Sequence, residues 1–110
     1  MNIQDYQSKA DLFKILSHPI RLQILNALRK QSCCVCHLQT VTQRPQAYIS
    51  QQLRVLREAG LAIDEKDGQN VYYRLCDETV DGLLREIFGR VFSPSTQPDC
   101  TCPKCMVENS

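Results

Sequence analysis

The sequence predicts a mainly α-helical domain that carries one small β-hairpin. Apolar residues recur at helical spacing in several segments, and Pro and Gly residues fall at the expected ends of those segments. One turn motif, Asp67-Gly68-Gln69-Asn70, separates two short runs that alternate in part between apolar and polar residues. A chain of 110 residues suits one domain with a modest core and is too short for two comfortable ones.

Two N-terminal helices, which can provide the scaffold, and one C-terminal helix are expected. The first covers residues 6–16, and the second has Pro19 near its first turn and ends by Gln31. His18, which precedes that proline, is expected to be a structural residue at the junction. The last helix, over residues 77–92, carries more apolar surface than it needs to bury within so small a domain. The first and last helices are therefore predicted to form a homodimer interface.

A short helix, a polar turn and a longer helix are predicted between residues 32 and 59. Ser32 is a good N-cap for a short helix that runs through Leu38 and Val41. The longer helix covers residues 44–59, with Pro45 suited to its first position and Gly60 to its end. This order is the helix-turn-helix arrangement, in which the second helix enters a DNA groove.

The longer helix has one apolar stripe and one polar face. Ile49, Leu53 and Leu56 share the stripe that is expected to be buried. The opposite face carries side chains that can hydrogen-bond to base edges or neutralise phosphates. The residues of this face are Gln46, Ala47, Ser50, Gln51, Arg54 and Arg57.

Acidic residues are missing from a long central stretch of the chain. The formal net charge is only +1, yet residues 12–57 contain no Asp or Glu. Such an asymmetry predicts a surface that faces a polyanion, and a symmetric dimer would double that surface. The basic residues of the stretch are Lys14, Arg21, Arg29, Lys30, Arg44, Arg54 and Arg57.

The predicted hairpin resembles the wing that accompanies many helix-turn-helix motifs. Its strands are expected over residues 61–66 and 71–76. Lys66 and Arg74 are placed to meet phosphate, although charges on a hairpin are as often merely solvated. The apolar residues expected on one side are Leu61 and Ile63, facing Val71, Tyr73 and Leu75.

Seven cysteines occur in this short chain. No apolar run approaches a membrane span and the first residues lack the features of a signal peptide, so a cytosolic location is expected. There, metal binding or redox sensing explains the cysteines better than a disulfide framework. Cys76 is expected to be a small buried apolar residue at the end of a strand. The others form two groups, namely Cys33, Cys34 and Cys36 within the domain of residues 1–92, and Cys100, Cys102 and Cys105 in a flexible tail of residues 93–110.

From about Leu12 to Phe92 the chain resembles the ArsR/SmtB family of metal-responsive winged-helix repressors. The matching stretches are Leu16-Ser-His-Pro-Ile-Arg-Leu-Gln-Ile-Leu25, Cys34-Val-Cys-His-Leu38, Ile49-Ser-Gln-Gln-Leu-Arg-Val-Leu-Arg-Glu-Ala-Gly-Leu61 and Gly68-Gln-Asn-Val-Tyr-Tyr-Arg-Leu75. The resemblance implies a homodimeric repressor that binds an inverted repeat near its own promoter and releases it when a metal or metalloid binds. It also implies recognition-helix positions at Gln46, Ala47, Tyr48, Ser50, Gln51 and Arg54.

Cys34-Val-Cys36 matches the motif of family members that sense arsenite, cadmium or lead, but two features depart from the family. Position 39, where some members have a third cysteine, is Gln39, and no cysteine precedes Cys33. A third thiolate must therefore come from elsewhere. The zinc site that some members build on the last helix is not matched, because the aligned positions hold Asp77, Thr79, Arg90 and Ser93.

The geometry of a regular helix limits how the first cysteine group can bind an ion. Residues two apart point about 200° away from each other, whereas residues three apart share a face. Cys33 with Cys36 therefore fits an undistorted helix better than Cys34 with Cys36. If Cys34 and Cys36 are both ligands, the first helical turn is expected to bend or unwind. His37 is interpreted as polar surface rather than as a ligand.

The tail cysteines leave several interpretations open. Cys34 and Cys36 could be joined by one or two of Cys100, Cys102 and Cys105, within or across subunits. The tail group could instead form its own trithiolate site, or bind nothing specific. Thiolates favour soft ions, with three sulfurs suiting As(III) or Pb(II) and four sulfurs suiting Cd(II) or Zn(II).

Two function classes follow from the residues and the resemblance together. The first is a DNA-binding repressor that is released by a thiophilic ion. The alternative keeps the same scaffold and replaces the ion by thiol redox or persulfide chemistry, because Cys33–Cys36 and Cys102–Cys105 are also Cys-x-x-Cys pairs. No hydrolytic triad, phosphate-binding loop or paired carboxylate motif is recognisable, so an enzyme is not expected.

Overall fold

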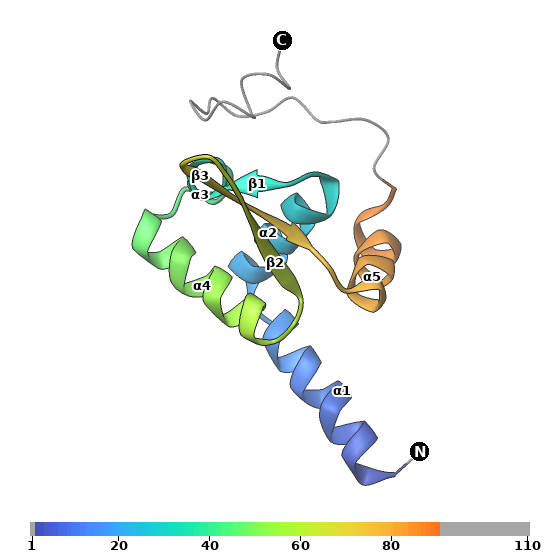
Figure 1. Ribbon diagram of the computed structural model, residues 1–110. Helices are drawn as coiled ribbons and strands as arrows, with labels where there is room; N and C mark the ends of the chain where they lie inside the picture. The colour runs from blue at the N-terminus through green and yellow to red at the C-terminus, as the bar shows by residue number, and fades with distance from the viewer. Residues whose placement is uncertain (1, 91–110) are drawn as a thin grey trace.

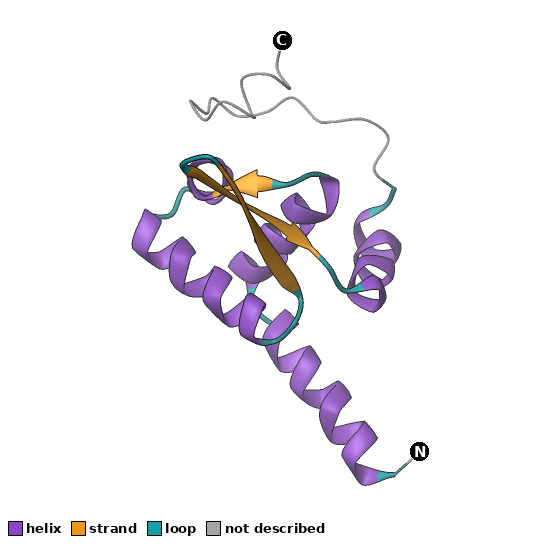
Figure 2. Ribbon diagram, in the orientation of Figure 1, coloured by secondary structure: helices purple, strands orange, loops and turns teal. Residues whose placement is uncertain are grey.

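The computed structural model describes residues 2–90, and the predictions for residues 91–110 lie outside this part of the chain. Five helices and a three-stranded antiparallel sheet confirm the predicted fold class within it (Figure 1 and Figure 2). None of these helices is long and apolar enough to cross a membrane. The elements are α1 (Ile3–Leu16), α2 (Pro19–Lys30), β1 (Cys33–Cys34), α3 (Val35–Thr42), α4 (Gln46–Glu58), β2 (Ala62–Asp67), β3 (Asn70–Leu75) and α5 (Glu78–Phe88).

The first two helices begin at well-formed caps. Asn2 and Asp5 form a reciprocal capping box at the start of α1. At the start of α2, Nδ1 of His18 accepts a hydrogen bond from the backbone N–H of Arg21 at 3.4 Å, and Pro19 follows directly. His18 is thus a structural residue at the junction, as predicted. Helix α1 projects away from the body of the domain (Figure 1).

The core lies between α2, α3, α4, α5 and the inner face of the sheet. The predicted stripe of α4 is confirmed, since Ile49, Leu53 and Leu56 are at most 1% exposed. Pro45 is the N-cap of α4 rather than its first helical residue. The other nearly inaccessible residues of the core include Ile24, Leu25, Leu38, Leu61, Val80 and Leu84.

The short third helix begins later than predicted. Ser32 is not its cap; Cys33 and Cys34 form the strand β1, and Cys34 is the N-cap of α3. The two cysteines pair antiparallel with β3, Cys33 opposite Tyr73 and Cys34 opposite Tyr72. The helix begins later because the backbone groups of Cys33 and Cys34 form hydrogen bonds with β3 instead of entering a first helical turn.

The wing is part of a three-stranded sheet in the order β1-β3-β2, rather than an isolated hairpin. Gly68 has φ +65° at the two-residue turn between Asp67 and Asn70, which confirms the turn prediction. The prediction that Ile63 shares a face of the hairpin with Leu75 is wrong, because Ala62 lies opposite Leu75 and Ile63 lies opposite Arg74. Residues that pair share a face, so this register places Ile63 on the side away from Leu75.

Two features near α5 differ from the sequence predictions. Asp77 caps the helix by accepting a hydrogen bond from the Val80 N–H at 2.9 Å, but α5 ends at Phe88 because Gly89, with φ +92°, does not continue it. Cys76 is exposed and lies beyond β3, and its thiol donates to the Gly60 carbonyl at 3.3 Å. It is therefore not the buried residue that was expected.

One polar contact ties α4 to α2. Nε of Arg21 donates to Oε1 of Gln52 at 2.8 Å, and Gln52 is only 7% exposed on the otherwise apolar side of α4. A part-buried hydrogen bond to a charged group is worth more than an exposed one, because its loss leaves the guanidinium desolvated without a partner. This contact thus helps to fix α4 against the body of the domain.

We expect Gln52→Ala to lower the free energy of unfolding by about 1–3 kcal/mol, because it removes the acceptor for Arg21. Gln51→Ala is the matched control, since Gln51 is exposed on the same helix and its loss should change stability by no more than about 0.5 kcal/mol. Urea denaturation of both variants measures the difference. Equal stability of the two variants would show that the contact contributes nothing.

Candidate nucleic-acid interface and thiolate site

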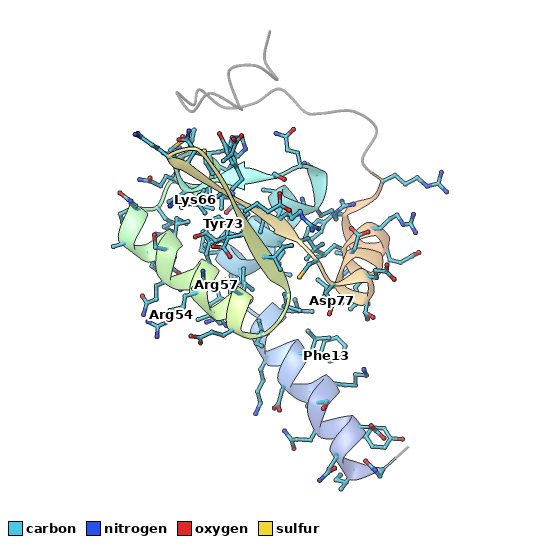
Figure 3. The ribbon with its side chains drawn as sticks, in the orientation of Figure 1. Phe13, Arg54, Arg57, Lys66, Tyr73 and Asp77 are labelled. Carbon is cyan, nitrogen blue, oxygen red and sulfur yellow. The ribbon has the colours of Figure 1, made fainter. Side chains whose placement is uncertain are left out.

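The outer face of α4 is open to solvent. All six residues predicted for this face are exposed, and Figure 3 shows Arg54 and Arg57 on α4 together with Lys66 on the hairpin. Tyr48 differs from them: it is half-buried and packs against the core. Its ring lies 5.9 Å from the guanidinium carbon of Arg44. Tyr48 therefore helps to hold Arg44 near the start of the helix.

Three basic side chains of this region form ion pairs within the described residues. The distances are 3.1 Å for Arg54–Glu58, 3.4 Å for Arg57–Asp64 and 3.0 Å for Arg74–Glu65. Exposed pairs of this kind contribute only about 0–1 kcal/mol each. Replacing these carboxylate partners by DNA phosphates would therefore cost little free energy. The ion pairs keep the arginine side chains near α4 and the wing, and they do not prevent contact with a phosphate.

The basic stretch of the sequence does not form a single surface. Arg21 is turned toward Gln52, and Nη2 of Arg29 donates to the Gly89 carbonyl at 2.8 Å, beyond the end of α5. Both arginines come from α2, whose position is set by its buried apolar side. Fewer basic side chains therefore remain on one surface than the charge count predicts. Lys66, on the hairpin, makes no ion pair with the rest of residues 2–90.

Cys34 and Cys36 lie together at the N-terminus of α3. Their sulfur atoms are 2.9 Å apart and share a hydrogen bond in which either thiol can be the donor. The expectation that these side chains point apart is wrong, because it placed both residues inside a helix. Cys34 is in the extended conformation, with φ −84° and ψ 167°, and only Cys36 is helical. No unwinding of the first turn is needed to bring the sulfurs together.

Cys33 is on the other side of the sheet. It is 1% exposed in the main core, and its thiol donates to the Gln31 carbonyl at 3.3 Å. Successive residues of a strand point to opposite faces, so β1 directs Cys33 inward and Cys34 outward. The pairing of Cys33 with Cys36 that a regular helix would favour is therefore wrong.

A small apolar cluster surrounds the thiol pair on the outer face of the sheet. Cys34 is 6% exposed and Tyr72 is 4% exposed, and Cys36 packs against both. His37 is 4% exposed, so it is not polar surface as predicted, and its backbone N–H donates to Sγ of Cys34 at 3.4 Å. Tyr72 is not among the site residues predicted from the sequence, because its place beside the thiols depends on the pairing of β1 with β3.

The chemistry of the thiol pair fits part of a site for a soft ion. A helix N-terminus favours thiolate over thiol, and thiolate is the form that binds such ions. Within residues 2–90 no group of three or more His, Cys, Asp or Glu side chains could hold a metal ion. The described residues thus bring only two sulfur atoms together at this place, and the other predicted ligands, Cys100, Cys102 and Cys105, lie outside them.

Comparison with known proteins identifies the family. Residues 18–64 match the family model for bacterial regulatory proteins of the arsR family. The chain is 34% identical over 99 residues to the arsenical resistance operon repressor of Bacillus subtilis, an alignment that covers 89% of this chain and 91% of that protein. A transcriptional repressor SmtB homolog of Synechocystis sp. is 38% identical over 87 residues, covering 79% of this chain and 66% of the relative.

The fold agrees with that assignment. The structure of reduced HlyU from Vibrio cholerae superposes with a TM-score of 0.73 at 29% identity and covers 81% of this chain and 93% of HlyU. The family and structural neighbours are DNA-binding transcriptional regulators and not enzymes. The combination of a winged helix-turn-helix, an exposed polar face on α4 and similarity to a repressor over 89% of the chain shows that this chain belongs to the ArsR/SmtB family of transcriptional repressors.

Proposed function

We propose that the protein is a cytoplasmic homodimeric repressor that reads operator DNA with α4 and contacts phosphates with its wing. The exposed polar face of α4 supports base contacts by Gln46, Ser50 and Gln51, while Arg54 and Arg57 are placed for phosphate or guanine. Lys66 and Arg74 extend the basic surface along the hairpin. Ala47 and Tyr48 complete the set of proposed interface residues, Ala47 by apolar contact and Tyr48 by positioning Arg44.

The proposed dimer interface is formed by α1 and α5. The large apolar side chains that remain exposed in residues 2–90 all lie on these two helices, and Figure 3 shows Phe13 projecting from α1. A second copy of the chain would cover them and would place two α4 helices for an inverted repeat. These side chains are Ile3, Tyr6, Phe13, Ile87 and Phe88.

The proposed effector is a thiophilic ion, namely As(III), Cd(II) or Pb(II), with Zn(II) also compatible. The observation that carries this proposal is the 2.9 Å approach of Cys34 and Cys36 at the N-terminus of α3, the helix that precedes α4. The similarity to an arsenical resistance repressor and to an SmtB homolog supports it. One or two of Cys100, Cys102 and Cys105 would complete the site, whereas Cys33 would remain in the core.

We expect Cys34→Ser to lose ion response while it keeps the fold, because a serine hydroxyl can replace the thiol as N-cap of α3 but cannot bind a soft ion. Reduced protein is titrated anaerobically with arsenite, Cd(II), Pb(II) and Zn(II), and operator affinity is measured by fluorescence anisotropy. Wild type should lose at least about tenfold in affinity with one of these ions, in the range typical of coupled sites. Cys76→Ser, at an exposed thiol away from α3, is the control and should respond like wild type. A full response in Cys34→Ser would contradict the proposed site.

The tail cysteines are tested in the full-length chain by changing Cys100, Cys102 and Cys105 together to serine. If they share the site with Cys34 and Cys36, the sulfur-to-metal charge-transfer band should weaken strongly and the ion should no longer release DNA, because two thiolates alone form an incomplete site. Two independent sites would instead leave DNA release intact while the number of bound ions falls. An unchanged band and stoichiometry would mean that the tail binds nothing specific.

The DNA-binding surface is tested by the salt dependence of operator affinity. We expect Lys66→Ala to weaken binding similarly for all sequences and to reduce the slope of log K against log salt by about 1.8, because the proposed dimer carries two copies of Lys66 and each lost phosphate contact changes the slope by about 0.9. Lys30→Ala removes an exposed charge at the end of α2 and should leave the slope unchanged. Identical slopes for wild type and Lys66→Ala would remove the wing from the proposed interface.

A thiol-responsive repressor is the alternative function. The observation in its favour is again the distance of 2.9 Å between two sulfurs, which need approach only to about 2.05 Å to form a disulfide, with loss of two protons and two electrons to an oxidant such as a peroxide or a polysulfide. The similar structure from Vibrio cholerae is described as reduced HlyU. If no ion affects operator affinity while an oxidant or persulfide abolishes it, this alternative replaces the ion.

A further inference from the structure

The sulfur pair is joined directly to the wing. Cys34 lies opposite Tyr72 in the pairing of β1 with β3, and Tyr72 lies opposite Glu65 in the pairing of β3 with β2. Tyr72 is the middle residue of this row, and its side chain packs with both cysteines in a cluster separate from the main core. A change in the position of Cys34 therefore alters the packing of Tyr72 first, and a movement of Tyr72 then shifts the hairpin.

The two sulfurs must separate before they can bind the same ion. They are 2.9 Å apart in this structure. Two sulfurs at about 2.3 Å from one tetrahedral Zn(II) are roughly 3.8 Å apart, and larger soft ions require a wider separation. Both thiol protons must also leave, because the ligating form of each cysteine is the thiolate. Ion binding is thus coupled to a displacement of roughly 0.9 Å in at least one of the two side chains.

Displacement of either sulfur reaches Tyr72, because the Tyr72 side chain packs with both cysteines. Cys36 belongs to α3, where its carbonyl accepts a hydrogen bond from the Thr40 hydroxyl at 3.1 Å and the same helix is anchored by Leu38, which is fully buried. Cys34 belongs to a two-residue strand at the edge of the sheet. Cys34 is 6% exposed and its Sγ accepts the His37 N–H at 3.4 Å, so a movement of its sulfur is passed on to β1 and to Tyr72 beside it.

The hairpin yields to such a displacement more readily than α4. Helix α4 is held by its buried stripe and by the bond between Arg21 and Gln52. The part of β2 that pairs with Tyr72 and the turn beyond it are exposed, and their side chains are held by surface ion pairs such as Arg74–Glu65. Local stability is lowest where few buried contacts are made, so the wing is the softer of the two DNA-binding elements.

We infer that Tyr72 is a positioning residue that transmits ion binding at Cys34 and Cys36 to the wing, so that release of DNA begins with movement of the hairpin that carries Lys66. This inference rests on the proposed ion-responsive function. In this mechanism β1 links the thiol pair to β3 of the wing. The ring of Tyr72 provides the contact, because it is the large side chain packed against both thiols.

The inference is tested with Tyr72→Leu in the full-length protein and with Cd(II) as the probe ion. We expect the charge-transfer band, the stoichiometry and the ion-free operator affinity to stay within about threefold of wild type, whereas the loss of affinity on ion addition should fall from at least about tenfold to less than threefold. Tyr73→Leu is the matched control on the opposite face of the same strand, where the side chain packs against the core. It should keep the full ion response.

A second measurement does not depend on a variant. Amide hydrogen exchange of wild type with and without Cd(II) should change in residues 62–75 and remain unchanged in Gln46–Glu58. Full coupling in Tyr72→Leu, or exchange changes confined to α4, would overturn the role of Tyr72 while leaving the ion-responsive function intact. If wild type itself does not release DNA with any of the four ions, the proposed function fails, and this inference fails with it.

Discussion

The backbone pairing of Cys33 and Cys34 with β3 is the constraint on which the rest of the thiol site depends. It holds Cys34 in the extended conformation, makes that residue the N-cap of α3 and sends its neighbour Cys33 into the core. A strand alternates its side chains between two faces, whereas a helix separates consecutive residues by about 100°. Two adjacent cysteines therefore acquire different environments, and Cys34 meets Cys36 although only one of the two is helical.

The proposed DNA-binding side of the molecule combines one rigid and one softer element. Helix α4 presents its polar face because its other side is locked into the core by Ile49, Leu53 and Leu56. The wing depends on strand pairing and on exposed ion pairs, which contribute little individually. A regulator needs a part of its DNA surface that can shift at low cost in free energy, and the hairpin has that property. The thiol pair lies beside β3, which is itself a strand of the wing.

Much of the fold could be predicted from local patterns. Pro19, the stripe of α4 and the turn at Gly68 each act within a few residues, so their effects are visible in the sequence. The start of α3 was not predictable in this way. Ser32 is the better N-cap by residue type. However, Cys33 and Cys34 pair with the backbone of β3, about 40 residues away in sequence, and this pairing determines where the helix begins. The extent of the basic surface was not predictable for a similar reason. The packing of α2 directs Arg21 toward Gln52 and Arg29 toward the Gly89 carbonyl.

The sequence by itself determined the fold class, the polar face of α4 and the presence of a cysteine motif suited to soft ions, because helical periodicity, turn chemistry and sulfur chemistry are properties of short segments. Only the tertiary structure decided which cysteines meet, that Tyr72 packs against them and that Cys76 is exposed. Those features depend on the register between strands that are distant in the chain. A shift of one residue would exchange the two faces of the sheet, and local sequence carries little information about that choice.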